Sequence, residues 1–199
     1  MTDRSVITKL DETAMKQQLG KEKILDAAIR LFASNGYHRT SVNQIASSAG
    51  VSKGLTYNYF SSKEDLLLAI INQASDDMSE VADNMASPDD YQKTLKGFLG
   101  AYVGFVKTNK TFLTFQLSLL FQPDLREIVA APLQKRANAL LKQVDALFKK
   151  AGVPQSLMTA RRLISELDGV ALHYLSVFEN YPLDKMKQQI YNNYKDLQK

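Results

Sequence analysis

The sequence predicts an all-α protein, and three observations support this fold class. Apolar residues recur at helical spacing along most of the chain, and the few glycines lie mostly at the ends of these segments. No segment shows the sustained alternation of Val, Ile and Thr that is typical of strands. We expect an N-terminal extension over residues 1–18, a first domain of short helices over 19–72, and a helical bundle over 73–199.

The first predicted helix covers residues 21–35. Its apolar positions form a single stripe made of Ile24, Leu25, Ala28, Leu31 and Phe32. The pair Asn35-Gly36 then supplies a left-handed C-terminal stop. Residues 1–18 carry balanced charge, and the sequence leaves open whether they fray or form an added helix.

Two very short helices follow. Ser41 and Gln44 have the spacing of a capping box, which starts a second helix. This helix presents Val42, Ile45, Ala46 and Ala49 on one face. Gly50 permits a tight turn, and Ser52 caps a third helix that ends at about Tyr59.

A fourth helix is predicted from a second capping box, formed by Ser61 and Glu64. It continues through the apolar run at 66–71 to about Asn84. Ser87-Pro88 marks the boundary of the next domain.

The second domain is expected to contain five further helices. Their predicted ranges are 89–108, 110–121, 124–151, 155–180 and 184–197, separated by Asn, Gly and Pro residues. Pro132 lies inside the third of these ranges. Because proline lacks an N–H and clashes with the preceding turn, we expect it to kink or break that helix.

Composition excludes several classes of protein. The chain of 199 residues has no Cys and only two His, His38 and His173, so it offers no thiol nucleophile or zinc–thiolate site. It also has no Gly-rich phosphate-binding loop. We therefore predict no enzyme activity, no metal and no cofactor.

The sequence has no candidate membrane segment. The longest apolar run is too short for a membrane span, and the N-terminus lacks the apolar core of a signal peptide. We therefore expect a soluble, cytoplasmic protein that does not bind a membrane.

The net charge of +4 is weak evidence for a nucleic-acid partner, but its distribution is more informative. Residues 27–63 contain Arg30, Arg39, Lys53 and Lys63 and no carboxylate at all. A surface that faces phosphates must be free of acidic groups. On charge alone, a chance gap among scattered charges remains an alternative.

The third helix carries tyrosines at positions 57 and 59. Residues two apart point about 200° apart on a helix, so at least one ring must face outward. Two short helices joined by a glycine turn make up a helix-turn-helix, whose second helix enters the major groove of double-stranded DNA. Lys53 offers positive charge there and Leu55 an apolar contact for a thymine methyl. Lys63 would meet a phosphate at the start of the fourth helix.

Two other interpretations compete with this one. Tyr57 and Tyr59 could be ordinary amphipathic surface rings, with Lys53 and Lys63 as solvated charges. The chain could also be a helical protein-binding module, but such a module would gain nothing from an acid-free segment and would show no salt-dependent DNA binding.

Residues 21–70 resemble the N-terminal domain of the TetR family of transcriptional regulators. The matching residues include Asn35-Gly36-Tyr37, Thr40-Ser41-Val42, Ala49-Gly50-Val51-Ser52, Tyr57-Asn58-Tyr59-Phe60 and Lys63-Glu64. The resemblance covers about a quarter of the chain without a gap. Thr56 departs from the pattern, because the family usually has an apolar residue there, and this leaves open which of Leu55 and Thr56 faces inward.

The resemblance implies a helix-turn-helix DNA-binding domain followed by a ligand-binding and dimerisation domain. Carried over by position, the DNA contacts fall on Thr40, Ser41, Asn43, Lys53, Gly54, Leu55, Tyr57, Asn58, Tyr59 and Lys63, with Val42 and Phe60 in the core. The implied function is that of a ligand-responsive repressor, acting as a homodimer on a palindromic operator.

The second domain matches no sequence pattern strongly. Polar groups among its large apolar residues could orient a small-molecule effector, and the candidate pocket residues are Tyr102, Phe105, Phe115, Gln116 and His173. The segment ISELDGVALHYL has small residues that allow close approach. It resembles the penultimate helix of the family, so we expect a homodimer through the helices at about 155–180 and 184–197.

Overall fold

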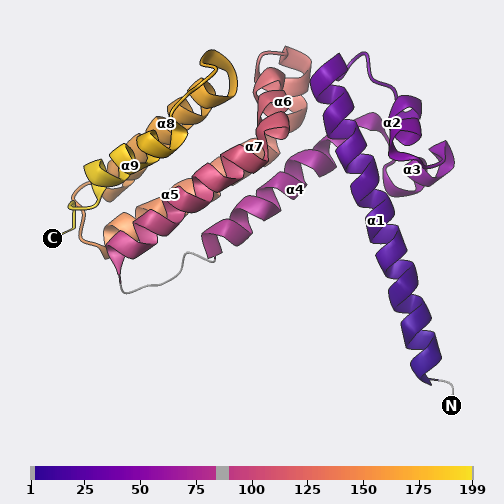
Figure 1. The fold of residues 1–199 in the computed structure, drawn as a ribbon, viewed down its shortest axis with the longest axis horizontal. Coiled ribbons are helices and arrows are strands. Elements are labelled where there is room, and N and C mark those ends of the chain that lie inside the picture. Colours follow the sequence, from indigo (N-terminus) through magenta and orange to yellow (C-terminus); the bar gives the residue numbers. More distant parts are fainter. Residues whose placement is uncertain (1–2, 84–89, 199) are drawn as a thin grey trace. The chain divides into compact units, whose positions relative to one another are not determined.

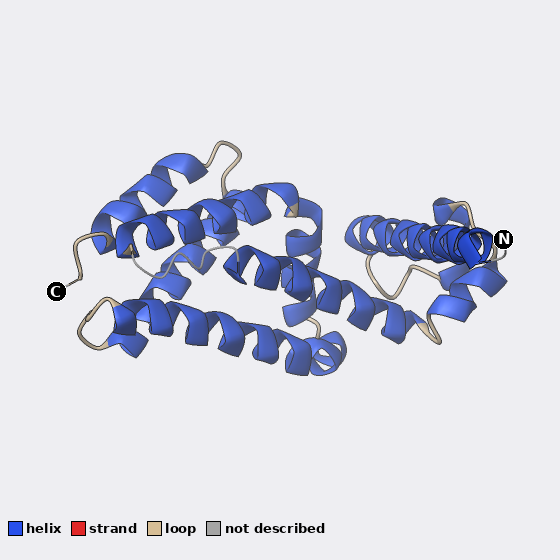
Figure 2. Ribbon diagram, turned by 90° about the horizontal axis from the view of Figure 1, so that it is seen from below, coloured by secondary structure: helices blue, strands red, loops and turns tan. Residues whose placement is uncertain are grey.

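The protein is built from helices. A computed structural model describes residues 3–83 and 90–198, and every regular element in those ranges is helical, which confirms the all-α prediction (Figure 2). None of the helices in these ranges is both long enough and apolar enough to cross a membrane. In chain order they are α1 (Asp3–Asn35), α2 (Val42–Ala49), α3 (Lys53–Tyr59), α4 (Lys63–Asp83), α5 (Tyr91–Thr108), α6 (Lys110–Leu120), α7 (Pro123–Lys150), α8 (Ser156–Leu172), the π-helical turn η1 (His173–Val177) and α9 (Leu183–Tyr194) (Figure 1).

The chain divides into two compact units, Met1–Ile70 and Ile71–Lys199. Helix α4 runs through this division without interruption. The boundary predicted at Ser87-Pro88 lies outside the described residues.

The first unit contains α1, α2, α3 and the beginning of α4. Its core consists of the apolar stripes of these helices, namely Ile24, Leu25, Ala28, Phe32, Ile45, Ala46, Phe60, Leu66, Leu67 and Ile70. Helix α1 stops as predicted, because Gly36 adopts a φ of 82° and donates its N–H to the Phe32 carbonyl at 3.0 Å. At its other end α1 is longer than residues 21–35. Residues 3–18 form an added helical segment, one of the two alternatives left open by the sequence.

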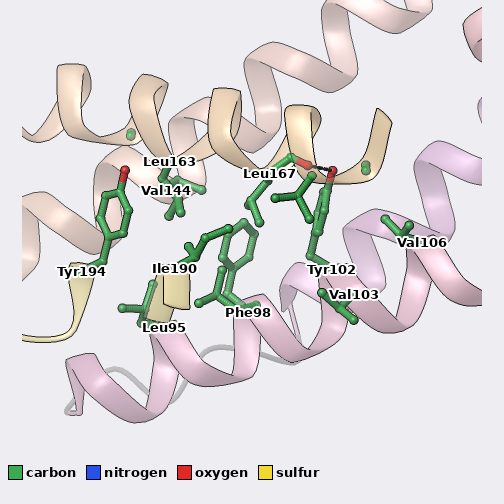
Figure 3. Packing of buried hydrophobic residues seen from close by; sticks show 14 of the residues in the cluster. Leu95, Phe98, Tyr102, Val103, Val106, Val144, Leu163, Leu167, Ile190 and Tyr194 are labelled. Carbon is green, nitrogen blue, oxygen red and sulfur yellow. Dashed lines mark hydrogen bonds between the residues drawn. The ribbon is translucent and has the colours of Figure 1, made fainter. Parts of the chain in front are cut away.

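The second unit is a bundle in which α7 packs along α8 and α5 packs along α9. Phe98 on α5, Val144 on α7, Leu163 on α8 and Ile190 on α9 meet in its apolar core (Figure 3). The Tyr102 hydroxyl on α5 donates a hydrogen bond of 3.2 Å to the Leu167 carbonyl on α8. The buried phenol is therefore satisfied by a neighbouring helix.

Three aromatic rings join α5, α7 and α9. Phe148 is fully buried, with its ring centroid 6.2 Å from that of Tyr91 and 6.0 Å from that of Tyr194, on which it stacks. The Tyr91 hydroxyl donates to the Tyr194 carbonyl at 2.6 Å. Packing and hydrogen bonding therefore fix the first helix of the bundle to its last.

Pro132 does not break its helix, contrary to the expectation from sequence. Helix α7 continues through it from Pro123 to Lys150. The proline costs about 3 kcal/mol in a helix interior. Leu125 and Val129 are buried before it, and Val144 and Phe148 after it. These residues pack both halves of α7 into the bundle, which offsets the missing hydrogen bond.

The segment predicted as one helix over 155–180 ends earlier. Helix α8 gives way to η1 at His173, and the chain leaves the helix at Phe178, whose N–H donates to the His173 carbonyl at 3.1 Å. The Phe178 ring lies edge-on to His173 at 5.3 Å and stacks on Tyr181 at 5.9 Å. These aromatic contacts stabilise the end of the helix at Phe178. The spacing of apolar residues alone did not indicate that the helix ends there.

Replacing Tyr91 with Phe tests the link between α5 and α9. Burial raises the pKa of Tyr91 to about 12, above the unfolded value of about 10. Its stabilising contribution is therefore complete below pH 10 and is lost as the pH rises toward 12. Y91F should lower the free energy of unfolding by about 1 kcal/mol at pH 8, and its deficit relative to the wild type should shrink at pH 11. Urea unfolding at both pH values measures this, and a deficit independent of pH would contradict it.

Candidate nucleic-acid interface

The predicted capping box starts α2. The Gln44 N–H donates to Ser41 Oγ at 3.3 Å, and the Ser41 N–H donates to Gln44 Oε1 at 2.8 Å. These two bonds satisfy backbone donors that have no partner inside the helix. The second helix therefore begins where the sequence placed it.

The turn between α2 and α3 depends on Gly50. This residue adopts a φ of 68°, a left-handed conformation that side chains disfavour. The next N–H, that of Val51, donates back to the Ala46 carbonyl at 3.0 Å. Ser52 then caps α3 by accepting the Leu55 N–H at 3.1 Å. Helices α2 and α3 thus form the predicted helix-turn-helix.

The inward residue of α3 is Thr56. Its side chain is buried, and its hydroxyl donates to the Ser52 carbonyl at 3.3 Å, so a polar residue is accommodated where an apolar one was expected. Leu55 is half-buried. The orientation that the sequence left open is therefore settled, with Thr56 inside and Leu55 partly accessible.

The outer face of α3 carries Tyr57. Its ring is 45% exposed, and the Lys53 ammonium lies 5.8 Å from the ring centroid. Gly54 and Asn58 are also exposed. This face therefore presents an aromatic hydroxyl, an amide and a cation, all of which can contact base edges or phosphates.

Tyr59 does not share this outward orientation. It is half-buried, and a Cβ added to Gly20 would lie 3.4 Å from its hydroxyl oxygen. The ring therefore lies against α1, at a position where α1 has no side chain. The expectation of an outward tyrosine holds for Tyr57, whereas Tyr59 packs within its own unit.

Thr40 is a second difference from the sequence prediction. Its side chain is 1% exposed, and its hydroxyl lies 2.9 Å from the Gly36 carbonyl and 3.2 Å from the Leu31 carbonyl. The hydroxyl therefore joins the end of α1 to the following loop. The Thr40 side chain is thus engaged within the unit, and its contact with DNA stays a prediction.

Lys63 is the third difference. Its ammonium donates to the carbonyls of Tyr37 at 3.0 Å and Thr40 at 3.1 Å, and it lies 4.3 Å from the centroid of the Tyr37 ring. The His38 carbonyl is 3.5 Å away. Burial lowers the pKa of this lysine, a cost that the carbonyls and the ring offset. The side chain expected at a phosphate thus holds the α1–α2 loop.

The cap of α4 lies one residue later than predicted. Ser62, and not Ser61, accepts the Asp65 N–H at 2.9 Å. The Asp65 carboxylate in turn accepts the Ser61 N–H at 2.9 Å. Asp65 therefore accepts the capping hydrogen bond that was assigned to Glu64. The cap can shift by one residue because the two serines are adjacent and so are the two acids.

The remaining candidates are accessible. Ser41 and Asn43 at the start of α2 are exposed, as are Arg30 and Arg39 from the acid-free segment. Arg39 was not among the predicted contacts. Its Nε donates to the Asn35 carbonyl at 2.8 Å, which keeps the side chain beside the α1–α2 loop.

The pocket candidates of the second unit fall into two groups. Tyr102, Phe105 and Phe115 are buried, and Gln116 is half-buried. His173 is exposed on η1 and is not enclosed, and its role in binding an effector stays a prediction. Its ring instead contacts those of Phe178 and Tyr181.

Sequence analysis missed one charged residue in the bundle. Arg136 Nη1 donates to Gln116 Oε1 at 3.1 Å, and the guanidinium carbon lies 5.7 Å from the Phe105 ring centroid. Arg136 follows Val129 by seven residues and precedes Val144 by eight, so it occupies the buried stripe of α7. Arg136 could have been identified from the sequence as a charged residue at an apolar position of the α7 stripe.

Comparisons with known proteins agree with this geometry. A sequence model of the family described as bacterial regulatory proteins, tetR family, matches residues 24–70. The uncharacterized HTH-type transcriptional regulator YuxN of Bacillus subtilis (strain 168) is 32% identical over 158 residues, which are 78% of this chain and 54% of the relative. The uncharacterized HTH-type transcriptional regulator YerO of the same organism is 34% identical over 165 residues, which are 79% of this chain and 55% of the relative.

The chain spans about half the length of these two curated relatives. A TetR transcription regulator from Haloarcula marismortui ATCC 43049, solved by crystallography, has a TM-score of 0.78 at 17% identity. The match covers 90% of this chain and 98% of that chain, and it shows a shared fold.

Replacing Lys63 with Met tests its structural role. The variant keeps the aliphatic stem but removes the donors to the loop carbonyls, so it should destabilise the first unit by about 1–3 kcal/mol. Hydrogen–deuterium exchange of peptides covering residues 31–45 should be faster than in the wild type. The matched control is K53M, because Lys53 is exposed and contacts only the Tyr57 ring. Equal exchange in K63M and K53M would show that Lys63 does not hold the loop.

Proposed function

Because the chain belongs to the TetR family of bacterial regulatory proteins, we propose that it is a sequence-specific DNA-binding repressor of transcription. It acts in the cytoplasm as a homodimer on a palindromic operator. A small-molecule effector that binds to the second unit releases the operator. The relatives named above are transcription regulators, and this supports a regulatory and not an enzymatic role.

The exposed face of α3 is the observation that carries this proposal. Lys53, Gly54, Tyr57 and Asn58 are all exposed on a helix of seven residues whose opposite side is buried. Such a helix fits the major groove, where Tyr57 and Asn58 meet base edges and Lys53 meets a phosphate. Leu55 supplies a partly accessible apolar group.

The start of α2 supplies contacts of a second kind. Ser41 and Asn43 are exposed beside the free N–H groups of this helix end. Contacts to phosphates from such positions fix the register of a protein on the duplex without reading its sequence. Tyr59 does not take part in DNA contact, since the hydroxyl edge of its ring packs on α1 at Gly20.

Dimerisation is supported by the outward side of α8. Met158 is 60% exposed and Leu172 is 43% exposed, while the small residues Ser165 and Gly169 lie between them. A two-fold interface would bury this face against its own copy. One helix-turn-helix reads too few base pairs for specificity, so two copies would read half-sites about 34–36 Å apart.

The switch is supported by the continuity of α4. This helix of 21 residues begins at the helix-turn-helix and continues beyond Ile70, into the second unit. An effector that binds one conformation of the bundle more tightly would bias the position of this helix. The spacing of the two α3 helices would then no longer match the operator.

DNA selected from a random library provides the ligand for testing the interface. Y57A and K53A should each weaken binding to the selected site about tenfold or more, and K53A should also reduce the slope of log affinity against log salt by about one. The control is K96A, since Lys96 is exposed on α5. Fluorescence anisotropy at several salt concentrations measures both quantities. Wild-type affinity in Y57A and K53A, with normal melting, would exclude α3 as the recognition helix.

Size-exclusion chromatography with light scattering tests the dimer. The wild type should have twice the 22.3 kDa chain mass, and L172E should shift toward the monomer because it buries an unpaired charge at the interface. F121E is the matched control, because Phe121 is 84% exposed and follows α6, outside the proposed interface helices. A monomeric wild type at micromolar concentration, or equal masses for both variants, would refute this assignment.

A further inference from the structure

Arg136 is a charged residue of the second unit that the DNA-binding role of the first unit does not explain. It stands midway along α7 on the buried side, and its half-buried guanidinium touches residues of α5 and α6. The guanidinium contacts the neutral amide of Gln116 and the face of Phe105. Neither contacting group carries a charge, so neither offsets the cost of burying the guanidinium.

No ion pair among the described residues supplies Arg136 with an anion in direct contact. The close pairs there join Lys107 and Lys187 to Asp184, and Arg162 to Glu166. Burial lowers the pKa of Arg136, while Tyr102 and Asp168 raise it. Asp168 therefore acts on the guanidinium, but it forms no ion pair with Arg136 in the part of the chain that the structure describes.

The remaining N–H groups of Arg136 are accessible. Among the described residues, no fully buried side-chain nitrogen or oxygen lacks a hydrogen-bond partner. Arg136 donates only one hydrogen bond there, through Nη1. A guanidinium has five N–H donors in a planar fork, so its other donors must reach solvent at a site bordered by Phe105 and Gln116.

We propose that Arg136 binds the carboxylate of a small amphipathic monocarboxylic acid, which is the effector of this protein. The inference rests on the proposed ligand-responsive function and names its ligand class. The carboxylate accepts a bidentate pair of hydrogen bonds from the guanidinium, and Gln116 donates through its amide nitrogen. The apolar part of the ligand packs on the rings that surround Arg136, beginning with Phe105.

The neighbours of Arg136 favour a carboxylate over a phosphate. Gln116, Phe105 and Tyr102 are neutral and Asp168 carries the opposite charge, so the site supplies no more than a single positive charge. A phosphate monoester carries nearly two negative charges at neutral pH and would need a second cation. A neutral alcohol would not supply an anion in direct, bidentate contact with the guanidinium.

Ligand binding to the full-length protein tests the proposal. The probes are dodecanoate and 2-naphthoate, with 1-dodecanol and 2-naphthalenemethanol as neutral analogues and dodecyl phosphate as the dianionic one. At least one carboxylate should raise the melting temperature and bind roughly tenfold to hundredfold more tightly than its alcohol by calorimetry. The same carboxylate should bind more tightly than the phosphate.

Variants of Arg136 and of its exposed neighbour Lys135 show whether the carboxylate preference depends on Arg136. R136Q should lose the preference for the carboxylate over the alcohol, and R136K should keep part of it, because lysine retains the charge but not the fork. K135Q removes an exposed charge from the same turn of α7 and should retain the preference. If R136Q does not fold, the loss of carboxylate affinity in R136K relative to K135Q decides. Equal binding of carboxylate and alcohol, binding unaffected by R136K and R136Q, or no binding of either carboxylate would overturn the proposal.

Measuring operator binding distinguishes a failure of the ligand assignment from a failure of the proposed regulatory function. A protein that binds its selected DNA but neither carboxylate would retain the regulatory role and lose the ligand assignment. A protein that binds a carboxylate through Arg136 but never binds DNA would lose the regulatory role instead.

Discussion

The capping hydrogen bonds of α2 and α3 determine how the first unit presents its outward side chains. Helices of eight and seven residues are too short to be stable by themselves. Each is therefore closed by its own cap, from Ser41 with Gln44 and from Ser52. Gly50 reverses the chain between them without strain. Because these local bonds and the buried face of each helix fix the backbone, the outward side chains of α3 are held in a defined arrangement before any partner arrives.

A second layer of contacts holds this pair of helices to the rest of the unit. The Thr40 hydroxyl and the Lys63 ammonium both bind backbone carbonyls of the α1–α2 loop. Tyr59 packs on α1 opposite Gly20. The sequence assigned these three residues to DNA, Thr40 only through the family resemblance, and in the structure their side chains hold the fold. The same segment therefore contains both the groups that face outward and the groups that hold them in place.

Local signals explain which features the sequence could predict. The capping box of α2, the stop at Gly36 and the turn at Gly50 involve residues within five positions of each other, so spacing alone was sufficient. Lys63 reaches a loop more than twenty residues away, and no local pattern encodes that contact. Pro132 was misjudged for a similar reason, since packing of both halves of α7 in the bundle outweighs a local penalty. The shift from Ser61 to Ser62 at α4 shows that adjacent equivalent residues leave a cap undetermined.

In the proposed interface Tyr57 faces DNA, while Tyr59 faces its own domain. Replacing each tyrosine in turn with a photo-cross-linking phenylalanine, and irradiating the complex with selected DNA, tests this claim most directly. The substitution keeps the ring in both positions, and at position 59 the added group must fit beside Gly20. We expect covalent DNA adducts from position 57 and only background from position 59. Adducts of equal yield at both positions, or adducts at 59 alone, would contradict it.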